Sequence, residues 1–185
     1  MAIELTQGVF MPLYLVEATL PEVAPEIVQT QLSELASAAS QQQAVLIEAQ
    51  VARSDRKIFV IVEADSETVA QAAVKPSPWA IAAIKQVRLI GQDPRTNPDR
   101  KTEANYLVEW DLPAGLTMET YLQRKAEKTP LYAQVPEVQF ERTYVCEDLS
   151  KCLCFYDGPD EAAVRRAREV VGAPIDRLAA IETIG

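Results

Sequence analysis

The sequence predicts an α+β protein made of two tandem ferredoxin-like repeats of the order βαββαβ, whose antiparallel four-stranded sheets pack together as an intrachain pseudo-dimer. Three observations support this prediction. A sequence motif recurs at an offset of 92 residues, both halves show the same order of strand and helix signals, and the third strand of each half is apolar on both faces.

The recurring motif lies in the first strand of each repeat. Tyr14-Leu-Val-Glu17 returns as Tyr106-Leu-Val-Glu109, and Leu-Pro follows both copies at the same spacing. Lys57–Glu63 corresponds in the same way to Lys151–Asp157, at an offset of 94. Matches at separate places that need a single two-residue insertion indicate an internal duplication.

A polar segment separates the two copies. Residues 92–103 contain two prolines and no aliphatic or aromatic side chain, which is typical of a linker. The sequence therefore predicts a first ferredoxin-like repeat at residues 1–91 and a second at residues 104–185.

Hydrophobic periodicity and turn residues define the elements of the first repeat. A helix that begins at Pro25 places Val28, Leu32 and Leu35 on one face, and proline suits its first turn. Pro76 ends the second helix. The predicted elements are a strand around 14–17, a helix from Pro25 to about Gln41, strands at 45–51 and 57–63, a helix from about Ser66, and a final strand at 86–90.

The second repeat shows the same signals. Thr117 suits the N-cap of the first helix. The last helix begins with acidic residues after Gly158-Pro159, contains several arginines toward its end and stops at Gly172, and this order of charges complements the helix dipole. The predicted elements are a strand around 106–109, a helix from Thr117 to about Lys128, strands at 138–146 and 151–157, the helix that ends at Gly172, and a final strand at 178–184.

The third strands lack polar alternation. Ile58, Val60 and Val62 alternate with the apolar Phe59 and Ile61, and residues 152–156 behave similarly. A strand with one face in water should alternate with polar residues. We expect the two sheets to cover each other, and a homo-oligomer that covers the same faces is the alternative.

Composition limits the partners. The chain of 185 residues has 18 basic and 27 acidic side chains, a formal net charge of −9. Neither half is basic, so a phosphate backbone would be repelled, and nucleic acid is not expected as a partner. No apolar run reaches the length of a membrane span, and the amino terminus lacks the basic region of a secretory signal. We expect a soluble, cytoplasmic protein without a membrane partner.

The chain contains no histidine. This absence removes the commonest general base and the commonest transition-metal ligand. The three cysteines, Cys146, Cys152 and Cys154, form no Cys-x-x-Cys pair, and the six glycines form no phosphate-binding loop. We therefore expect no metal, no cofactor and no catalytic residue, which favours a protein that is not an enzyme.

The second half carries a family resemblance. It rests on Tyr106-Leu-Val-Glu109 with Asp111, on the segment from Lys151 to Val164, and on the helix end that leads through Gly172 to Pro174. On these residues the second half resembles a small nickel-binding, ferredoxin-like family best known from actinobacteria. The resemblance implies a ferredoxin-like fold and a dimeric family member, and it is weaker in the first half.

The chain departs from this family at the metal site. Family members place histidines after the first strand and within and after the last helix. The matching positions here are Glu109, Trp110, Arg168, Ala173 and approximately Ala179, and none is histidine. The resemblance therefore carries over the fold and not the nickel.

Candidate ligand-binding residues are Glu17, Glu109, Trp110, Arg142 and Cys154. Glu17 and Glu109 end equivalent strands and would approach each other if the two sheets face each other. Paired carboxylates suit general acid–base catalysis or the binding of a hard cation. Alternatively, each is solvated. Trp110 suits the floor of a pocket, or it packs at a strand end. Cys154 shares a strand face with Cys152, and the simpler interpretation is that both are small core residues.

Arg142 lies at the same parity as Val138, Phe140 and Tyr144, on an apolar strand face. Such an arginine extends its charged end to solvent, pairs with an acid, or awaits an anionic ligand. The simpler of these interpretations pairs it with Glu109 or its neighbour Asp111.

The leading functional hypothesis is a non-catalytic binding or assembly module with a small-ligand cleft between the repeats, so its partner is a small molecule or a protein. One alternative is a cofactor-free enzyme of the dimeric α+β barrel type that uses carboxylates and Arg142. Another is a metal or redox sensor that uses the cysteines and acids. An enclosed pocket lined by Glu109, Arg142 and a tryptophan would favour ligand binding or catalysis, and a flat apolar patch would favour assembly.

Overall fold

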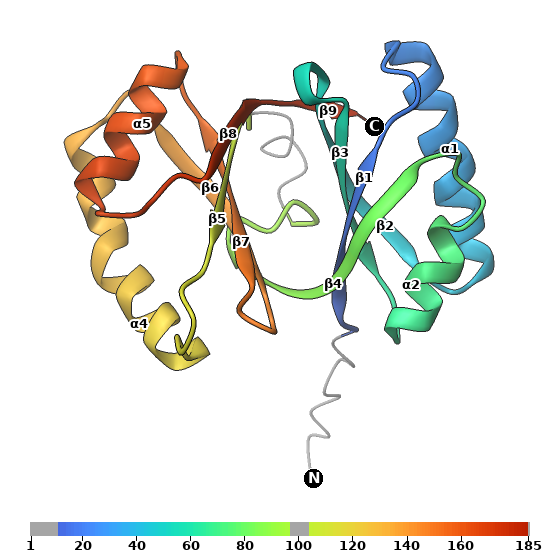
Figure 1. Ribbon diagram of the computed structural model, residues 1–185, viewed down its shortest axis with the longest axis horizontal. Coiled ribbons are helices and arrows are strands. Elements are labelled where there is room, and N and C mark those ends of the chain that lie inside the picture. Colours follow the sequence, from blue (N-terminus) through green and yellow to red (C-terminus); the bar gives the residue numbers. More distant parts are fainter. Residues whose placement is uncertain (1–10, 97–103, 185) are drawn as a thin grey trace, which may run out of the picture.

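The computed structural model describes residues 11–96 and 104–184 (Figure 1). The elements of both halves follow the predicted order of strands and helices, except that the final strand predicted at 178–184 is divided into two short strands. In the first half they are β1 (Leu13–Thr19), α1 (Pro25–Gln41), β2 (Val45–Ala52), the 3-10 turn η1 (Arg53–Asp55), β3 (Lys57–Glu63), α2 (Glu67–Val74) and β4 (Ala80–Gly91). In the second half they are β5 (Tyr106–Asp111), α4 (Met118–Lys128), the 3-10 helix η2 (Thr129–Gln134), β6 (Gln139–Cys146), β7 (Lys151–Asp157), α5 (Glu161–Val170), β8 (Arg177–Ala180) and β9 (Glu182–Ile184).

Side-chain caps fix the starts of three helices. Ser66 accepts a hydrogen bond from the amide of Val69 at 3.3 Å at the start of α2. Thr117 and Asp160 do the same at α4 and α5, at 3.2 Å and 2.8 Å. Each cap satisfies one of the amides that the first turn leaves without a partner. The predicted start at Thr117 is thus confirmed.

Within the described residues, the nine strands form one antiparallel sheet, in the order β8-β5-β7-β6-β4-β1-β3-β2-β9, which curls into a nearly closed barrel. The prediction of two separate four-stranded sheets was wrong. The reason lies in β4, which is twelve residues long. Its beginning pairs with β1, and its end, from Val87 to Gly91, pairs with β6 of the second half.

The carboxy-terminal strands make a second connection between the halves. β8 pairs with β5 in its own half, and β9 then pairs with β2 in the first half, where Ile184 lies opposite Ala49. Each half therefore contributes a final strand segment to the edge of the other.

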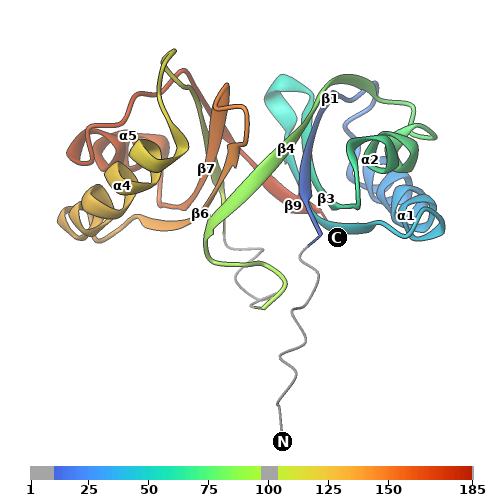
Figure 2. The same ribbon diagram turned by 90° about the horizontal axis from the view of Figure 1, so that it is seen from below.

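Three apolar cores follow from this arrangement. The helices lie on the outer flanks of the molecule, α1 and α2 on one side and α4 and α5 on the other, with the strands between them (Figures 1 and 2). Ile58, Val60 and Val62 pack toward α1 and α2. Phe59 and Ile61, on the opposite face of β3, join a central core that also contains side chains of the second half. The expectation that the two halves cover each other's apolar faces agrees with this core.

A β-bulge in β6 determines which residues enter the central core. The pairing of β6 with β7 shifts between Phe140 and Arg142. Phe140 consequently packs on the helix side, with Val138, whereas Arg142 and Tyr144 point into the centre. The simple parity that grouped Arg142 with Val138 and Phe140 was therefore wrong.

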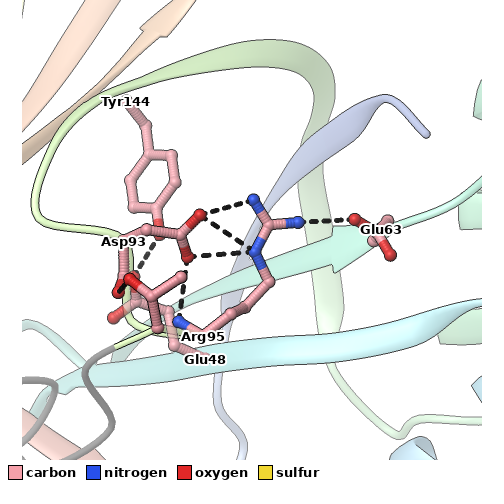
Figure 3. Close-up of polar contacts among 6 residues, drawn as sticks. Glu48, Glu63, Asp93, Arg95 and Tyr144 are labelled. Atoms are coloured by element: carbon pink, nitrogen blue, oxygen red, sulfur yellow. Dashed lines mark hydrogen bonds and ion pairs between the residues drawn. The ribbon is translucent and has the colours of Figure 1, made fainter. Parts of the chain in front are cut away.

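The first residues of the predicted linker pack on one end of the barrel. Gln92 donates from its amide to the carbonyl of Glu141 at 2.8 Å. Arg95 bridges Asp93 and Glu63, with its Nη1 2.5 Å from the Glu63 carboxylate (Figure 3). Residues 97–103 of the predicted linker lie outside the described part of the chain, and the division into two domains stays a prediction.

None of the helices in the described ranges is both long and apolar enough to cross a membrane.

Candidate functional site

A cavity of about 480 Å³ lies in the second half, between the outer face of the sheet and the helical layer. Strands β5 and β7 form its floor, and α4, η2 and the end of α5 form its walls. Its volume falls within the range of small-molecule sites. The side chains and backbone that surround it belong to Trp110, Leu116, Tyr121, Arg124, Lys125, Glu127, Lys128, Thr129, Tyr132, Cys152, Cys154, Arg168, Val171, Gly172, Ala173 and Pro174.

The cavity exists because the two helical layers differ. In the first half, the 17-residue α1 buries Val28, Leu32, Leu35 and Ala39 and packs directly on α2. In the second half, the 11-residue α4 buries only Tyr121 among its own residues, and η2 lies between α4 and α5 and contacts both. A shorter helix with one buried side chain cannot fill the space over the sheet, so the layer stays open there.

Aromatic rings form one wall. The hydroxyls of Tyr132 and Tyr156 lie 2.7 Å apart, and the ring of Tyr132 stacks on that of Phe140 with 5.5 Å between centroids. Burial raises the pKa of Tyr132 to about 12, so this phenol stays neutral and acts as a hydrogen-bonding group at physiological pH. The wall thus offers flat apolar faces with a polar edge.

Arg168 provides the dominant charge of the cavity. It is 2% exposed, and its Nη1 donates to the Tyr156 hydroxyl at 3.2 Å and approaches the Cys154 sulfur at 3.5 Å. Its Nη2 donates to the carbonyl of Pro174, and its guanidinium lies 5.8 Å from the centroid of Trp110. Among the described residues, none of these partners is a carboxylate, and Nε has no hydrogen-bond partner.

Burial disfavours the Arg168 charge, but the neighbouring Cys154 and Tyr156 outweigh it and raise the pKa of the guanidinium. Arg168 is therefore permanently charged. Around it, the lining contains three more cationic side chains and a single acidic one, Glu127. A chain of net charge −9 thus encloses a cationic cavity.

Two thiols lie on the floor of the cavity. Cys152 and Cys154 alternate along β7, both point toward the helices, and their sulfurs are 3.9 Å apart. Thr143 lies 3.2 Å from the Cys154 sulfur through its hydroxyl. The contact with the Cys152 thiol lowers the pKa of Cys154, burial opposes this, and Lys125 and Arg168 add to the lowering. The contact with Cys154, together with burial, raises the pKa of Cys152, so Cys154 is the first of the pair to ionise.

Of the five predicted ligand-binding residues, the structure places Trp110 and Cys154 at this cavity. It brings Glu17 and Glu109 together elsewhere. Lys151 forms ion pairs with both, at 2.7 Å from the Glu109 carboxylate, and Glu109 is also 3.1 Å from Arg177. The two equivalent carboxylates therefore approach each other as expected, but through a shared lysine rather than as a bare pair.

Arg142 lies in the central core, fully buried. Its Nε and Nη2 donate to the two oxygens of Glu48 at 2.8 and 2.6 Å, and its guanidinium lies 5.2 Å from the Phe155 ring. Tyr144 donates to the same carboxylate (Figure 3). The prediction that Arg142 pairs with Glu109 or Asp111 was wrong, because the bulge in β6 turns Arg142 toward β2 of the first half.

Sequence reasoning missed the importance of Arg168 and Tyr121 to the site. The signal was present, since Ala163, Val164 and Ala167 define an apolar face of α5 that continues through Arg168. A charged residue on such a face needs an unusual partner. Tyr121 gave a weaker signal, as one of several apolar side chains of α4, and it is the one that is buried.

The fold is shared with proteins of the ferredoxin-like, dimeric α+β barrel kind. A crystal structure described as a candidate chlorite dismutase, TA0507, has a TM-score of 0.53 at 13% identity and covers 94% of this chain and 95% of its own. A heme-binding protein from Thermus thermophilus has a TM-score of 0.51 at 10% identity and covers 95% of this chain and 92% of its own. At these identities the likeness establishes the fold alone.

The second half also matches a family in sequence. Residues 106–181 match the profile of the family described as nickel responsive protein SCO4226-like. This confirms the resemblance inferred for the second half from its motifs. A comparison with curated protein sequences finds no significant match.

The residues of this chain do not suit nickel at the family's positions. Glu109 is engaged by Lys151 and Arg177, and Arg168 places a guanidinium where a ligand would be needed. Within the described residues, no three Cys, Asp or Glu side chains gather closely enough to hold a metal ion. The site is therefore interpreted without nickel.

Proposed function

We propose that the protein binds a small organic anion with a flat apolar body in the cavity of its second half, and that the first half serves as a structural counterpart. The observation that carries this proposal is Arg168, a buried cation whose contacts among the described residues include no carboxylate. A buried guanidinium without a carboxylate partner is costly, and a bound anion would relieve that cost.

The shape and lining of the cavity suit the rest of such a ligand. Its volume of about 480 Å³ and the rings of Trp110, Tyr121 and Tyr132 suit an aromatic or other planar body. Lys125 is placed near the same space, 4.3 Å above the ring of Phe140, and would attract the anion on entry.

A duplicated scaffold explains why one half can be structural. The connections between the halves are reciprocal, because β4 pairs first with β1 and then with β6, while the β8–β9 segment pairs first with β5 and then with β2. This exchange, together with the repeated motif, supports an intrachain pseudo-dimer. One copy fills its helix–sheet space with α1, and the other leaves it open.

The ligand cleft expected between the halves is replaced by this cavity. The central core and the Glu48–Arg142 pair occupy much of the space between the halves. A smaller hollow of about 220 Å³ lies at one end of the seam, beside Lys151.

A pair of fluorescent probes tests the proposal. The anionic probe 8-anilinonaphthalene-1-sulfonate and the neutral N-phenyl-1-naphthylamine share an aromatic body and differ in the sulfonate. We expect one molecule of the anionic probe to bind per chain, with energy transfer from Trp110, and the neutral probe to bind at least tenfold more weakly. Equal affinity of the two probes would contradict a cationic site.

Variants locate the binding. Arg168→Gln should lower the affinity for the anionic probe by about tenfold to a hundredfold, as expected for the loss of one charge-assisted hydrogen bond. The affinity for the neutral probe should not change. Arg165→Gln, on the exposed side of the same helix, is the matched control and should change neither affinity. Lys125→Gln provides a second test should Arg168→Gln fold poorly. Unchanged affinity in both cavity variants would reject the site.

A further inference from the structure

The thiol pair on the cavity floor supports a second kind of binding, which does not depend on the organic anion. Cys152 and Cys154 are 0% and 1% exposed, line the same cavity, and present two sulfurs 3.9 Å apart on one strand face. We propose that these two thiols form a binding site for a monovalent thiophilic cation of the Cu(I) class.

The separation of the sulfurs suits a shared ion. Thiolates bind soft metals at about 2.3 Å, so two sulfurs around one ion lie up to about 4.6 Å apart when the arrangement is linear. The observed 3.9 Å is shorter than this limit, so an ion between the two sulfurs would have a bent arrangement. Because residues two apart on a strand share a face, both thiols approach the ion from the same side of the sheet.

The surroundings favour thiolates. Thr143 contacts the Cys154 sulfur, as does Nη1 of Arg168. These donors stabilise negative charge on sulfur and would take the place of water around a buried complex.

Charge balance selects a monovalent ion. Two thiols that bind a monovalent cation release two protons to solvent and give a complex of charge −1. Arg168 and Lys125, which line the same cavity, would compensate that charge. A divalent ion would give a neutral dithiolate and leave the cationic lining uncompensated. It would also lack further ligands, since no group of three ligating acidic or thiol side chains occurs in the described residues. Soft thiolate donors select Cu(I), zinc and iron–sulfur clusters, and among these Cu(I) is the monovalent ion.

A competition assay tests the site. The full-length, reduced protein is titrated anaerobically with Cu(I) in the presence of bathocuproine disulfonate, whose coloured complex reports the copper that the protein does not hold. We expect one Cu(I) per chain to be withdrawn from the chelator. Failure of the wild-type protein to compete at all would overturn the proposal.

The third cysteine provides a matched control. Cys146 is equally buried but lies in the central core, away from the cavity. Cys146→Ser should retain the full stoichiometry, whereas Cys152→Ser and Cys154→Ser should each bind Cu(I) at least a hundredfold more weakly. Equal losses in all three variants would refute a specific pair.

Two further readouts keep the inference testable if a cysteine variant folds poorly. X-ray absorption of the Cu(I)-loaded wild-type protein should show two sulfur neighbours, and a first shell of oxygen or nitrogen alone would refute the site. In the wild-type protein the copper titration is followed through the chelator and the anion titration through the fluorescence of the naphthalene probe, so failure of the copper site and failure of the anion site are distinguishable.

Discussion

The ion pair between Glu48 and Arg142 gives a sharp test of how the two halves are joined. Both side chains are 0% exposed, and the pair links β2 of the first half to β6 of the second. Glu48 also accepts hydrogen bonds from Tyr144 and, at 3.0 Å, from Gln50. Burial and the Glu48 charge both raise the pKa of Tyr144, which keeps this phenol neutral and donating.

We predict that Glu48→Gln lowers the free energy of unfolding by about 3 kcal/mol or more, because removing one partner of a buried pair typically costs about 3–5 kcal/mol. The amide preserves the volume and most acceptor positions, so the loss reports the charge left on Arg142. For a chain of this size, the corresponding decrease in Tm is about 6–12 °C.

Urea unfolding followed by circular dichroism measures this loss. Glu147→Gln is the matched control, since Glu147 pairs with Arg88 across the same junction of β4 and the second half. This pair lies on the surface, where such pairs contribute about 0–1 kcal/mol to stability. In the double variant Glu48→Met/Arg142→Met, which removes both charges, much of the stability should return. A loss below about 1 kcal/mol in Glu48→Gln, no larger than in the control, would refute the reasoning.

Three further predictions concern separate parts of the fold. The Lys85 ammonium holds the pKa of Asp148 at about 2, below its ordinary 3.8. This carboxylate therefore contributes stability that is fully present above pH 3.8 and is lost as the pH falls through 2. In Lys85→Met, the pKa of Asp148 measured by NMR titration should return toward 3.8. Gly91→Ala should lower the free energy of unfolding in urea by about 2 kcal/mol more than Gly172→Ala. Both glycines have a positive φ, but a Cβ at Gly91 would lie 2.8 Å from a backbone oxygen, whereas a Cβ at Gly172 would meet open space. Asp160→Ala should cost about 1 kcal/mol by removing the cap of α5, with Asp160→Asn retaining most of it, and equal losses in the two variants would contradict the capping role.

Local patterns predicted the elements well because their signals are local. Pro25 at the first turn and the spacing of Val28, Leu32 and Leu35 defined α1, which the structure confirms over Pro25–Gln41. The apolar parities of β3 and β7 predicted burial on both faces, and each face packs into a different core.

The sheet connection was harder to predict because it depends on register. The pattern around residues 86–90 indicated a strand, but nothing in it shows that β4 continues from β1 to a partner in the other half. The bulge at Phe140 and Arg142 similarly reverses the faces of β6, and a two-residue alternation cannot reveal an inserted residue.

The candidate site was predicted in part. Trp110 and Cys154 were identified and lie at the cavity, but the cleft was expected between the halves rather than beneath α4. The cavity arises from what α4 lacks in comparison with α1, and a missing set of side chains gives no positive pattern in the sequence. Arg168 could have been found by asking why an arginine follows the apolar face of α5.

The side-chain Nε–H resonance of Arg168 offers the most direct test of the anion site. Arg168 lines the cavity, and its Nε is buried and lacks a hydrogen-bond partner among the described residues. In a ¹⁵N-resolved NMR titration with 8-anilinonaphthalene-1-sulfonate, we predict that this resonance shifts and saturates together with the fluorescence signal. The proposed site would be contradicted if the fluorescence saturates while the Arg168 resonance does not move, and if the shifts are confined to the first half or to the seam beside Lys151.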